Sequence, residues 1–289
     1  MKHNYLNNKD ILKEIHKSKT TYCSFLSESD HFYDMILPSV DKINKKNVAL
    51  AKKLRAERLA KVNFELAQSQ STEKLKLDDF TIKPSKIPET DIVFRVMTWE
   101  HIPLDAKKNK PILEDDPPVE TEYDDEVAVV SPKHTKVNFP PFQHYKVNDD
   151  GQPYCVGKSH WKGDLIKGSF CKEHGTMTPK LAHMFMKLCE RYATRSNWRG
   201  YTYNDEMRSQ ALLQLSQIGL QFDESKSQNP FAYYTAAITN SFTRVLNIEK
   251  RNQNLRDDIL EMNGLTPSYT RQGMGSWGGS SQTTDYNEE

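Results

Sequence analysis

Apolar residues recur at helical spacing in three consecutive segments between Thr178 and Arg256. The first segment opens with Thr178-Pro179, a hydroxyl cap followed by proline at the first helical position, where its missing N–H is not needed. Intervals of three or four residues then separate its apolar positions, which are Leu181, Phe185, Leu188 and Tyr192. This spacing predicts an amphipathic helix that ends before Asn197 to Gly200.

A second helix is predicted to start near Thr202, with Asp205 as a plausible capping partner three residues later. The positions expected on its buried face are Met207, Ala211, Leu215, Ile218 and Phe222. The polar run from Asp223 to Gln228 ends the pattern.

The third helix repeats the cap-and-proline start at Asn229-Pro230 and is expected to run to about Lys250. One face is apolar and comprises Tyr234, Ile238, Phe242, Val245 and Ile248. Another face carries amides, a hydroxyl and cations, and comprises Tyr233, Ala236, Asn240, Thr243, Asn247 and Lys250, with Arg244 and Arg251 at its edge. Such groups suit base edges and phosphates, although an ordinary solvated helix face is the alternative.

The run from Glu206 to Arg251 resembles region 2 of the bacterial sigma factors. It is most similar to the late-transcription sigma factors of large contractile-tailed (myovirus-type) phages. The details that carry the resemblance are Phe222-Asp223, the sequence NPFAY starting at Asn229, and Thr243-Arg244. The opening segment from Asn4 to Lys9 also resembles the first residues of those phage proteins.

The resemblance implies that the second helix docks on the clamp helices of the largest subunit of host core RNA polymerase. By position, the polymerase-binding candidates are Asp205, Glu206, Arg208, Ser209, Gln210, Leu213 and Gln214, of which Leu213 could equally belong to the core. It further implies that the third helix recognises and melts promoter DNA. The DNA-binding candidates are Phe231, Tyr233, Asn240, Thr243, Arg244, Asn247, Lys250 and Arg251, with the two aromatic residues expected to stack on bases of the opened strand.

The chain departs from the family in two places. Ala236-Ala237 stands where main-family sigma factors carry a tryptophan pair, so another aromatic group would have to unpair the DNA; Trp198, Tyr201 and Tyr203 are candidates, unless they form a packed loop. Phage relatives end in a segment that binds the DNA sliding clamp, whereas the tail GMGSWGGSSQTTDYNEE has no compact apolar motif. Whether a sliding clamp or a coactivator is a partner therefore stays open, and a single AT-rich promoter element is expected.

Composition and charge indicate a small helical unit with long polar segments outside it. The 289 residues are only 36% hydrophobic and the mean hydropathy is −0.77. The net charge is +1, but Lys180 to Arg256 holds 11 Lys/Arg against 6 Asp/Glu, whereas Glu114 to Glu126 holds 8 acids and no base. A local basic excess can attract DNA without a basic overall composition.

These patterns predict a mainly α protein in four parts. Residues 1–70 form an amino-terminal helical segment, and residues 71–177 a Pro-rich, acidic, extended and partly disordered insert with little strand. Residues 178–256 form the compact sigma region 2-like unit, and residues 257–289 a flexible tail. Within the insert, Asp91 to Trp99 is the best strand candidate, and Asp149-Asp150-Gly151 predicts a turn between two short extended pieces.

Catalytic and metal-binding patterns are weak. Cys155, His160, Cys171 and His174 could suggest a zinc site or a metal-dependent nuclease, but zinc sites usually bring ligands in two tight pairs, and no acid cluster lies nearby. The chain lacks the phosphate-binding GxxxxGK[ST], GxSxG and HExxH patterns. We therefore expect no enzyme activity, no cofactor and no bound metal.

No signal peptide and no apolar run near 18 residues is present, which favours a protein of the host cell cytoplasm without membrane contact. The sequence thus predicts a phage sigma factor that directs host polymerase to late promoters. The alternative is a polymerase-binding coactivator or structural adaptor that uses the same docking helix but does not read DNA.

Overall fold

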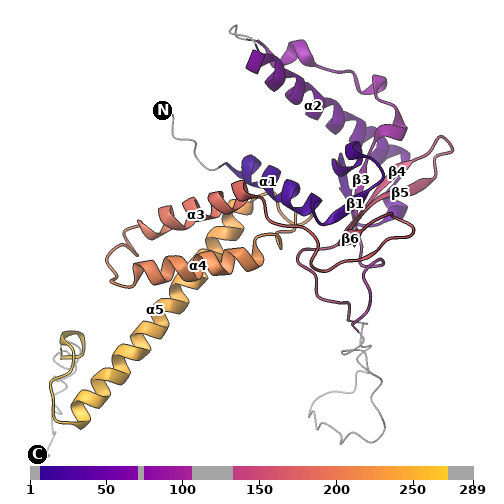
Figure 1. Cartoon of the computed structure of the whole chain (residues 1–289). Coiled ribbons are helices and arrows are strands. Elements are labelled where there is room, and N and C mark those ends of the chain that lie inside the picture. Colours follow the sequence, from indigo (N-terminus) through magenta and orange to yellow (C-terminus); the bar gives the residue numbers. More distant parts are fainter. Residues whose placement is uncertain (1–6, 71–74, 106–132, 273–289) are drawn as a thin grey trace, which may run out of the picture. The chain divides into compact units, whose positions relative to one another are not determined.

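The protein has an α/β fold, which we describe from a computed structural model over residues 7–70, 75–105 and 133–272 (Figure 1). Contacts divide the chain into two compact units. Unit 1 comprises residues 1–184 and 218–231, and unit 2 comprises residues 185–217 and 232–289. Among the described helices, none combines the length and the apolar composition of a membrane-spanning segment.

A five-stranded mixed sheet is the centre of unit 1, with strand order β1-β5-β4-β3-β2. Its strands are β1 (Cys23–Phe25), β2 (Met35–Leu37), β3 (Phe94–Met97), β4 (Phe142–Val147) and β5 (Pro153–Ser159). All neighbours are antiparallel except β2 and β3, which pair in parallel with Ile36 opposite Arg95. A separate two-stranded sheet pairs β6 (Trp161–Lys162) with β7 (Ser169–Phe170).

The expectation of a mainly α protein with little strand is therefore wrong. The error has a physical cause, because β1 and β2 are three residues long and each pairs with a strand distant in sequence. Such pairs leave no run of alternating residues for a local pattern to detect. The strand expected within Asp91 to Trp99 is confirmed as β3, and the expected turn connects β4 to β5, with Gly151 at a φ of 81°.

Helix α2 (Lys45–Gln70) contributes Val48, Ala51 and Ala56 to the apolar core of unit 1. The sheet contributes Leu37, Phe94, Val96 and Val147 to the same cluster, which Ile87 and Ile92 complete. Because side chains alternate along a strand, Phe94 and Val96 point to one face of the sheet while Arg95 points to the other.

Helix α1 (Asn8–Thr20) begins at an Asn7 cap, whose side chain accepts a hydrogen bond from the Lys9 N–H at 3.3 Å. Its buried side contains Ile11 and Ile15, which are 2% and 0% exposed. Short 3₁₀ helices join the other elements of unit 1, at Glu28–His31, Val40–Lys42, Leu77–Phe80, Pro84–Lys86 and Glu89–Asp91.

Three helices supply the regular structure of unit 2: the end of α3 (Pro179–Ala193), α4 (Asn204–Ile218) and α5 (Pro230–Met262). The predicted starts at Thr178-Pro179 and Asn229-Pro230 are confirmed, and the Thr178 carbonyl accepts the Ala182 N–H at 3.1 Å. Aromatic contacts stabilise the unit. The ring centroids of Phe185 and Tyr234 lie 4.7 Å apart, and those of Tyr192 and Phe242 lie 5.3 Å apart.

Helix α5 is longer than predicted, because it continues past Lys250 to Met262. After Met262 the chain turns at Gly264, whose φ is 70°, and the Leu265 N–H donates to the Leu260 carbonyl at 2.9 Å. The chain then runs back along the helix, where Ser268 donates its backbone and hydroxyl hydrogens to Asp257 at 2.8 and 2.7 Å. Of the segment expected to be a flexible tail, residues 257–272 thus have a described structure, and the rest lies outside the described residues.

Candidate nucleic-acid and polymerase interfaces

One exposed face of α5 gathers five of the eight DNA-binding candidates into a shallow surface depression. It is lined by Asn240, Thr243, Arg244, Asn247, Ile248 and Arg251. These residues are separated by three or four positions, so they lie on neighbouring turns of one helix face. We call this set the α5 polar face.

The inner side of α5 holds this face outward. Tyr234, Ile238 and Phe242 are fully buried, and Val245 is 6% exposed. Ile248 was predicted on the same apolar side, and that prediction is wrong, because Ile248 is 48% exposed and lines the depression. The cause is length: α5 has 33 residues, whereas α3 and α4 have 15 each, so the shorter helices cannot cover its later turns.

The charge of the α5 polar face is positive. Arg244 and Arg251 line it, and the side chain of Lys250 is exposed nearby on the same helix. The nearest acid in sequence, Glu249, accepts a hydrogen bond from Asn252 at 3.3 Å. The arrangement offers side-chain amides and a hydroxyl for hydrogen bonds to bases, beside cations for phosphates.

The aromatic candidates lie in the first turn of α5, outside the depression. Tyr233 is 37% exposed, and its ring contacts that of Tyr234 at 5.2 Å. Phe231 is partly buried, and its backbone N–H donates to the Asn8 side chain at 3.0 Å. The structure therefore gathers five of the six polar candidates and leaves these two rings outside the depression.

The loop between α3 and α4 supplies three aromatic residues, of which Trp198 is part of the packing. Its ring lies 5.4 Å from that of buried Phe242 and 6.3 Å from that of Tyr192. Tyr201 and Tyr203 contact each other at 5.2 Å. Of the two interpretations of this loop, the contacts of Trp198 favour the packed one for that residue.

The polymerase-binding candidates occupy the outward side of α4, because Met207, Ala211 and Leu215 are fully buried on the other side. Their exposed or half-buried side chains are Asp205, Glu206, Arg208, Ser209, Gln210, Leu213 and Gln214. Leu213 is 54% exposed and so does not belong to the core. We call this set the α4 outer face.

Polar side chains of the α4 outer face contact one another. Arg208 and Asp205 form an ion pair at 3.1 Å, and Gln210 donates to the Glu206 carboxylate at 3.0 Å. The face therefore carries both charge signs beside the exposed Leu213.

A buried charged cluster in unit 1 was not predicted. Lys19 of α1 is 2% exposed, and its ammonium donates to Glu224 at 2.9 Å and to the Phe222 carbonyl at 2.7 Å. Arg95 of β3 lies 3.7 Å from the other oxygen of Glu224 and donates to His144 of β4 at 3.0 Å. The polar run containing Glu224 looks like a solvated loop in the sequence, and no local signal distinguishes this one buried carboxylate.

The environment sets the protonation states of the cluster. Burial raises the pKa of Glu224, but the charges of Lys19 and Arg95 lower it more, so the net shift is downward and the group is a carboxylate. Burial, with Arg95 adding to it, lowers the pKa of His16 to about 3 and that of His144 well below its ordinary value. Both imidazoles are therefore neutral near pH 7. Burial also lowers the pKa of Lys19, and the nearby carboxylate of Glu224 offsets part of this shift.

The four cysteine and histidine residues considered as a metal site are not assembled into one. Among the described residues, no group of three or more His, Cys, Asp or Glu side chains could hold a metal ion. His160 is fully buried, and burial lowers its pKa to about 3. Its backbone carbonyl accepts the Cys171 N–H at 2.9 Å, while its ring packs 4.1 Å from that of Phe139.

Comparison with known proteins adds no assignment: no protein-family model, curated protein or solved structure gives a significant match to the chain.

Proposed function

We propose that this protein is a phage-encoded sigma factor. It binds host core RNA polymerase and directs initiation at late promoters through a single AT-rich element about ten base pairs upstream of the start. The activity consists of binding and strand capture, without covalent chemistry. The resemblance of Glu206 to Arg251 to sigma region 2 motivates the proposal.

The observation that carries the proposal is the α5 polar face. Had these side chains been buried against the protein's own core, no partner could reach them. Instead, Asn240, Thr243, Arg244, Asn247 and Arg251 line an exposed depression. An amide can bond bidentately to adenine, and arginine and lysine can hold phosphates, so this face has the groups that a short AT-rich element requires.

A second surface supports attachment to the polymerase. The α4 outer face is separate in sequence from the α5 polar face and carries the exposed Leu213 among charged and amide side chains. Two distinct surfaces are what a specificity factor needs, because it must hold the enzyme and the promoter at the same time.

Run-off transcription tests the proposal, with purified host core polymerase and a template that carries a TATAAATA-like element. The test variant replaces Asn240, Thr243 and Arg244 together by Ala. A matched control replaces Asn252, Asn254 and Arg256, which are exposed on α5 outside the depression, by Ala. We expect the test variant to lose promoter choice while still binding polymerase, and the control to keep both.

The adaptor alternative predicts a different result. If the test variant keeps promoter choice and polymerase binding, the α5 polar face does not read DNA, and the protein acts as a coactivator or structural adaptor. Under this alternative, the Leu213→Asp variant should still lose polymerase binding, because an adaptor would dock through the same α4 outer face.

A further inference from the structure

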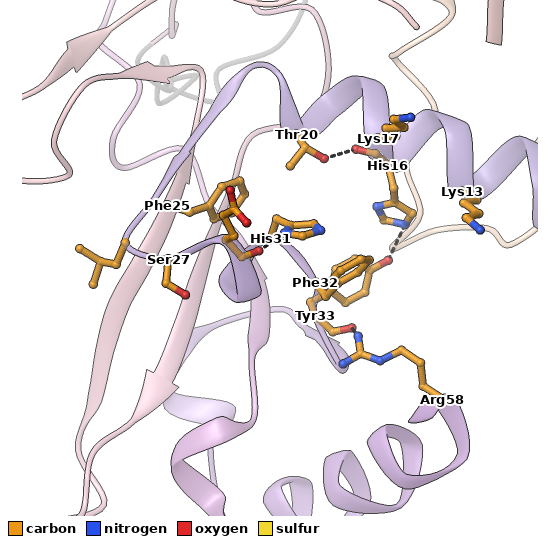
Figure 2. A pocket seen from close by; sticks show the side chains of 12 residues that line it. Lys13, His16, Lys17, Thr20, Phe25, Ser27, His31, Phe32, Tyr33 and Arg58 are labelled. Carbon is orange, nitrogen blue, oxygen red and sulfur yellow. Dashed lines mark hydrogen bonds between the residues drawn. The ribbon is translucent and has the colours of Figure 1, made fainter. Parts of the chain in front are cut away.

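A pocket in unit 1 lies between α1, the segment after β1, and α2 (Figure 2). Its volume is about 990 Å³, which is near the upper end of the range for ligand sites. The lining residues that matter for its chemistry include Lys13, Lys17, Phe25, Phe32, Tyr33 and Arg58. None of these residues belongs to the α5 polar face or the α4 outer face.

Flat rings form much of the pocket wall. Phe32 is 58% exposed, which is unusual for a large apolar ring, and its ring lies 3.8 Å from that of His31. Tyr33 and Phe25 are half-buried and line the same space. Figure 2 shows Phe32 and Tyr33 between α1 and the Arg58 side chain of α2. A planar ligand could therefore stack on a ring that is already exposed.

The rings are fixed by their surroundings. The Tyr33 hydroxyl and the His16 ring nitrogen are hydrogen-bonded at 3.0 Å, and the guanidinium of Arg58 lies 5.7 Å from the Phe32 ring centre. Arg58 also binds Asp34 at 2.7 Å and donates to the Tyr33 carbonyl at 2.9 Å. These contacts of Arg58 stabilise the positions of Phe32 and Tyr33 in the pocket wall.

Two further cations lie on the rim of the pocket. Lys13 and Lys17 are exposed, lie one helical turn apart on α1, and line the pocket on its α1 side. The pocket lining contains a single acid, Glu28. An anionic ligand is therefore favoured at the rim, next to the stacking surface.

We propose that this pocket binds single-stranded nucleic acid, with a base stacked on Phe32 and neighbouring phosphates held by Lys13 and Lys17. Rings beside cations are the groups that bind single strands without sequence preference. An acidic peptide would satisfy the lysines but would leave the exposed ring without a planar partner. The site goes beyond the proposed function, because it can bind a strand whether or not the α5 polar face reads a promoter.

Binding of a fluorescently labelled single-stranded DNA of about 12 nucleotides tests the site by anisotropy. All proteins carry the Asn240, Thr243 and Arg244 to Ala changes, so that the α5 polar face is weakened and whatever binding it keeps is the same in every variant compared. In this background, Phe32→Leu removes the ring but keeps an apolar side chain, and we expect about fivefold or greater weakening, as for the loss of one stacked base. Leu66→Ala, at an exposed apolar position of α2 outside the pocket, is the control and should bind like the background protein.

The lysines give a second measurement. In the same background, Lys13→Ala with Lys17→Ala should reduce the slope of log affinity against log salt by about 1.4, or about 0.7 for each lost phosphate contact on a single strand. The control pair Lys46→Ala with Lys53→Ala changes exposed lysines of α2 outside the pocket and should leave the slope unchanged.

Crosslinking places the strand directly. Single-stranded DNA carrying 5-iodouracil should crosslink to a peptide that contains Phe32 or Tyr33. The proposal is overturned if crosslinks map only elsewhere, or if Phe32→Leu binds as tightly as its background. It is equally overturned if a poly-glutamate peptide competes as well as an unlabelled oligonucleotide of equal charge.

Discussion

The ammonium of Lys19 lies 2.9 Å from the carboxylate of Glu224, and both side chains are buried. The pair joins α1 to the segment that connects α4 with α5, over 205 residues of sequence. Arg95 adds a second positive charge 3.7 Å from the same carboxylate. Within unit 1, the segment that contains Glu224 is therefore held to α1 and β3 by charge as well as by apolar packing.

Replacing Glu224 by Gln should destabilise the protein strongly. The change leaves the buried ammonium of Lys19 and guanidinium of Arg95 without their anion, and removing one partner of a buried pair costs about 3–5 kcal/mol. Urea unfolding measures the loss. Glu57→Gln, at an exposed position of α2, is the control and should stay within about 0.5 kcal/mol of the wild type. Equal effects of the two changes would show that the cluster adds nothing to stability.

Stability should fall as the pH is lowered from about 7 towards 5. His16, His144 and His160 have pKa values lowered mainly by burial, to about 3 for His16 and His160, so they stay neutral in the folded chain. The unfolded chain takes up protons at these imidazoles near pH 6.5. Because the unfolded state then binds more protons, the free energy of unfolding decreases by up to about 1.4 kcal/mol per pH unit for each histidine.

Urea unfolding at pH 7.5, 6.0 and 5.0 measures this dependence. The lowered pKa of Glu224 acts in the same direction at lower pH, because that carboxylate is stabilising only while ionised. A free energy of unfolding that is constant between pH 7.5 and 5.0 would contradict the neutral, buried state of these histidines.

Gly175→Ala should destabilise the protein more than Gly151→Ala. Both glycines have a positive φ, of 90° and 81°, which costs any other residue about 1–2 kcal/mol. At Gly175 a Cβ would also lie 2.6 Å from the Thr21 carbonyl oxygen, whereas at Gly151 it would meet nothing within 4 Å. Thermal or urea unfolding of both variants provides the comparison, and equal losses would mean that Thr21 moves aside freely.

The carboxy-terminal helices could be predicted from the sequence because their information is local. Thr178-Pro179 and Asn229-Pro230 mark the starts of α3 and α5, and spacing alone identified the buried Tyr234, Ile238 and Phe242. The outward direction of Asn240 and Thr243 follows from the same periodicity. Recognition of DNA by that face stays a prediction.

The sheet and the pocket could not be predicted in this way, because they depend on contacts between distant residues. β1 pairs with β5 across more than a hundred residues, and Arg95 meets Glu224 only in the folded chain. The local pattern around Phe32 and Tyr33 did not indicate that Lys13 and Lys17 of α1 would line the same pocket. The acidic run from Glu114 to Glu126 lies outside the described residues.

Leu213→Asp should abolish binding to core polymerase without unfolding the protein. The side chain is 54% exposed, so the change removes no core contact, and we expect stability within about 0.5 kcal/mol of the wild type. At the centre of an interface the new charge would be desolvated without a partner and would cost several kcal/mol. Co-migration with core polymerase measures binding. Ser216→Asp, at another exposed position of α4 outside the α4 outer face, is the control.

Asn240 and Lys250 should contribute to DNA binding in different ways. If Asn240 bonds a base edge, Asn240→Ala should cost about 1–3 kcal/mol on the preferred element and relax the preference at one base position only. If Lys250 holds a phosphate, Lys250→Ala should weaken binding to all sequences alike and reduce the salt slope by about 0.7–0.9, depending on whether the strand is open. Promoter libraries with single-base changes, bound by the polymerase complex at several salt concentrations, separate the two effects. A uniform loss for Asn240→Ala, or a base-specific loss for Lys250→Ala, would contradict the roles assigned to these residues on α5.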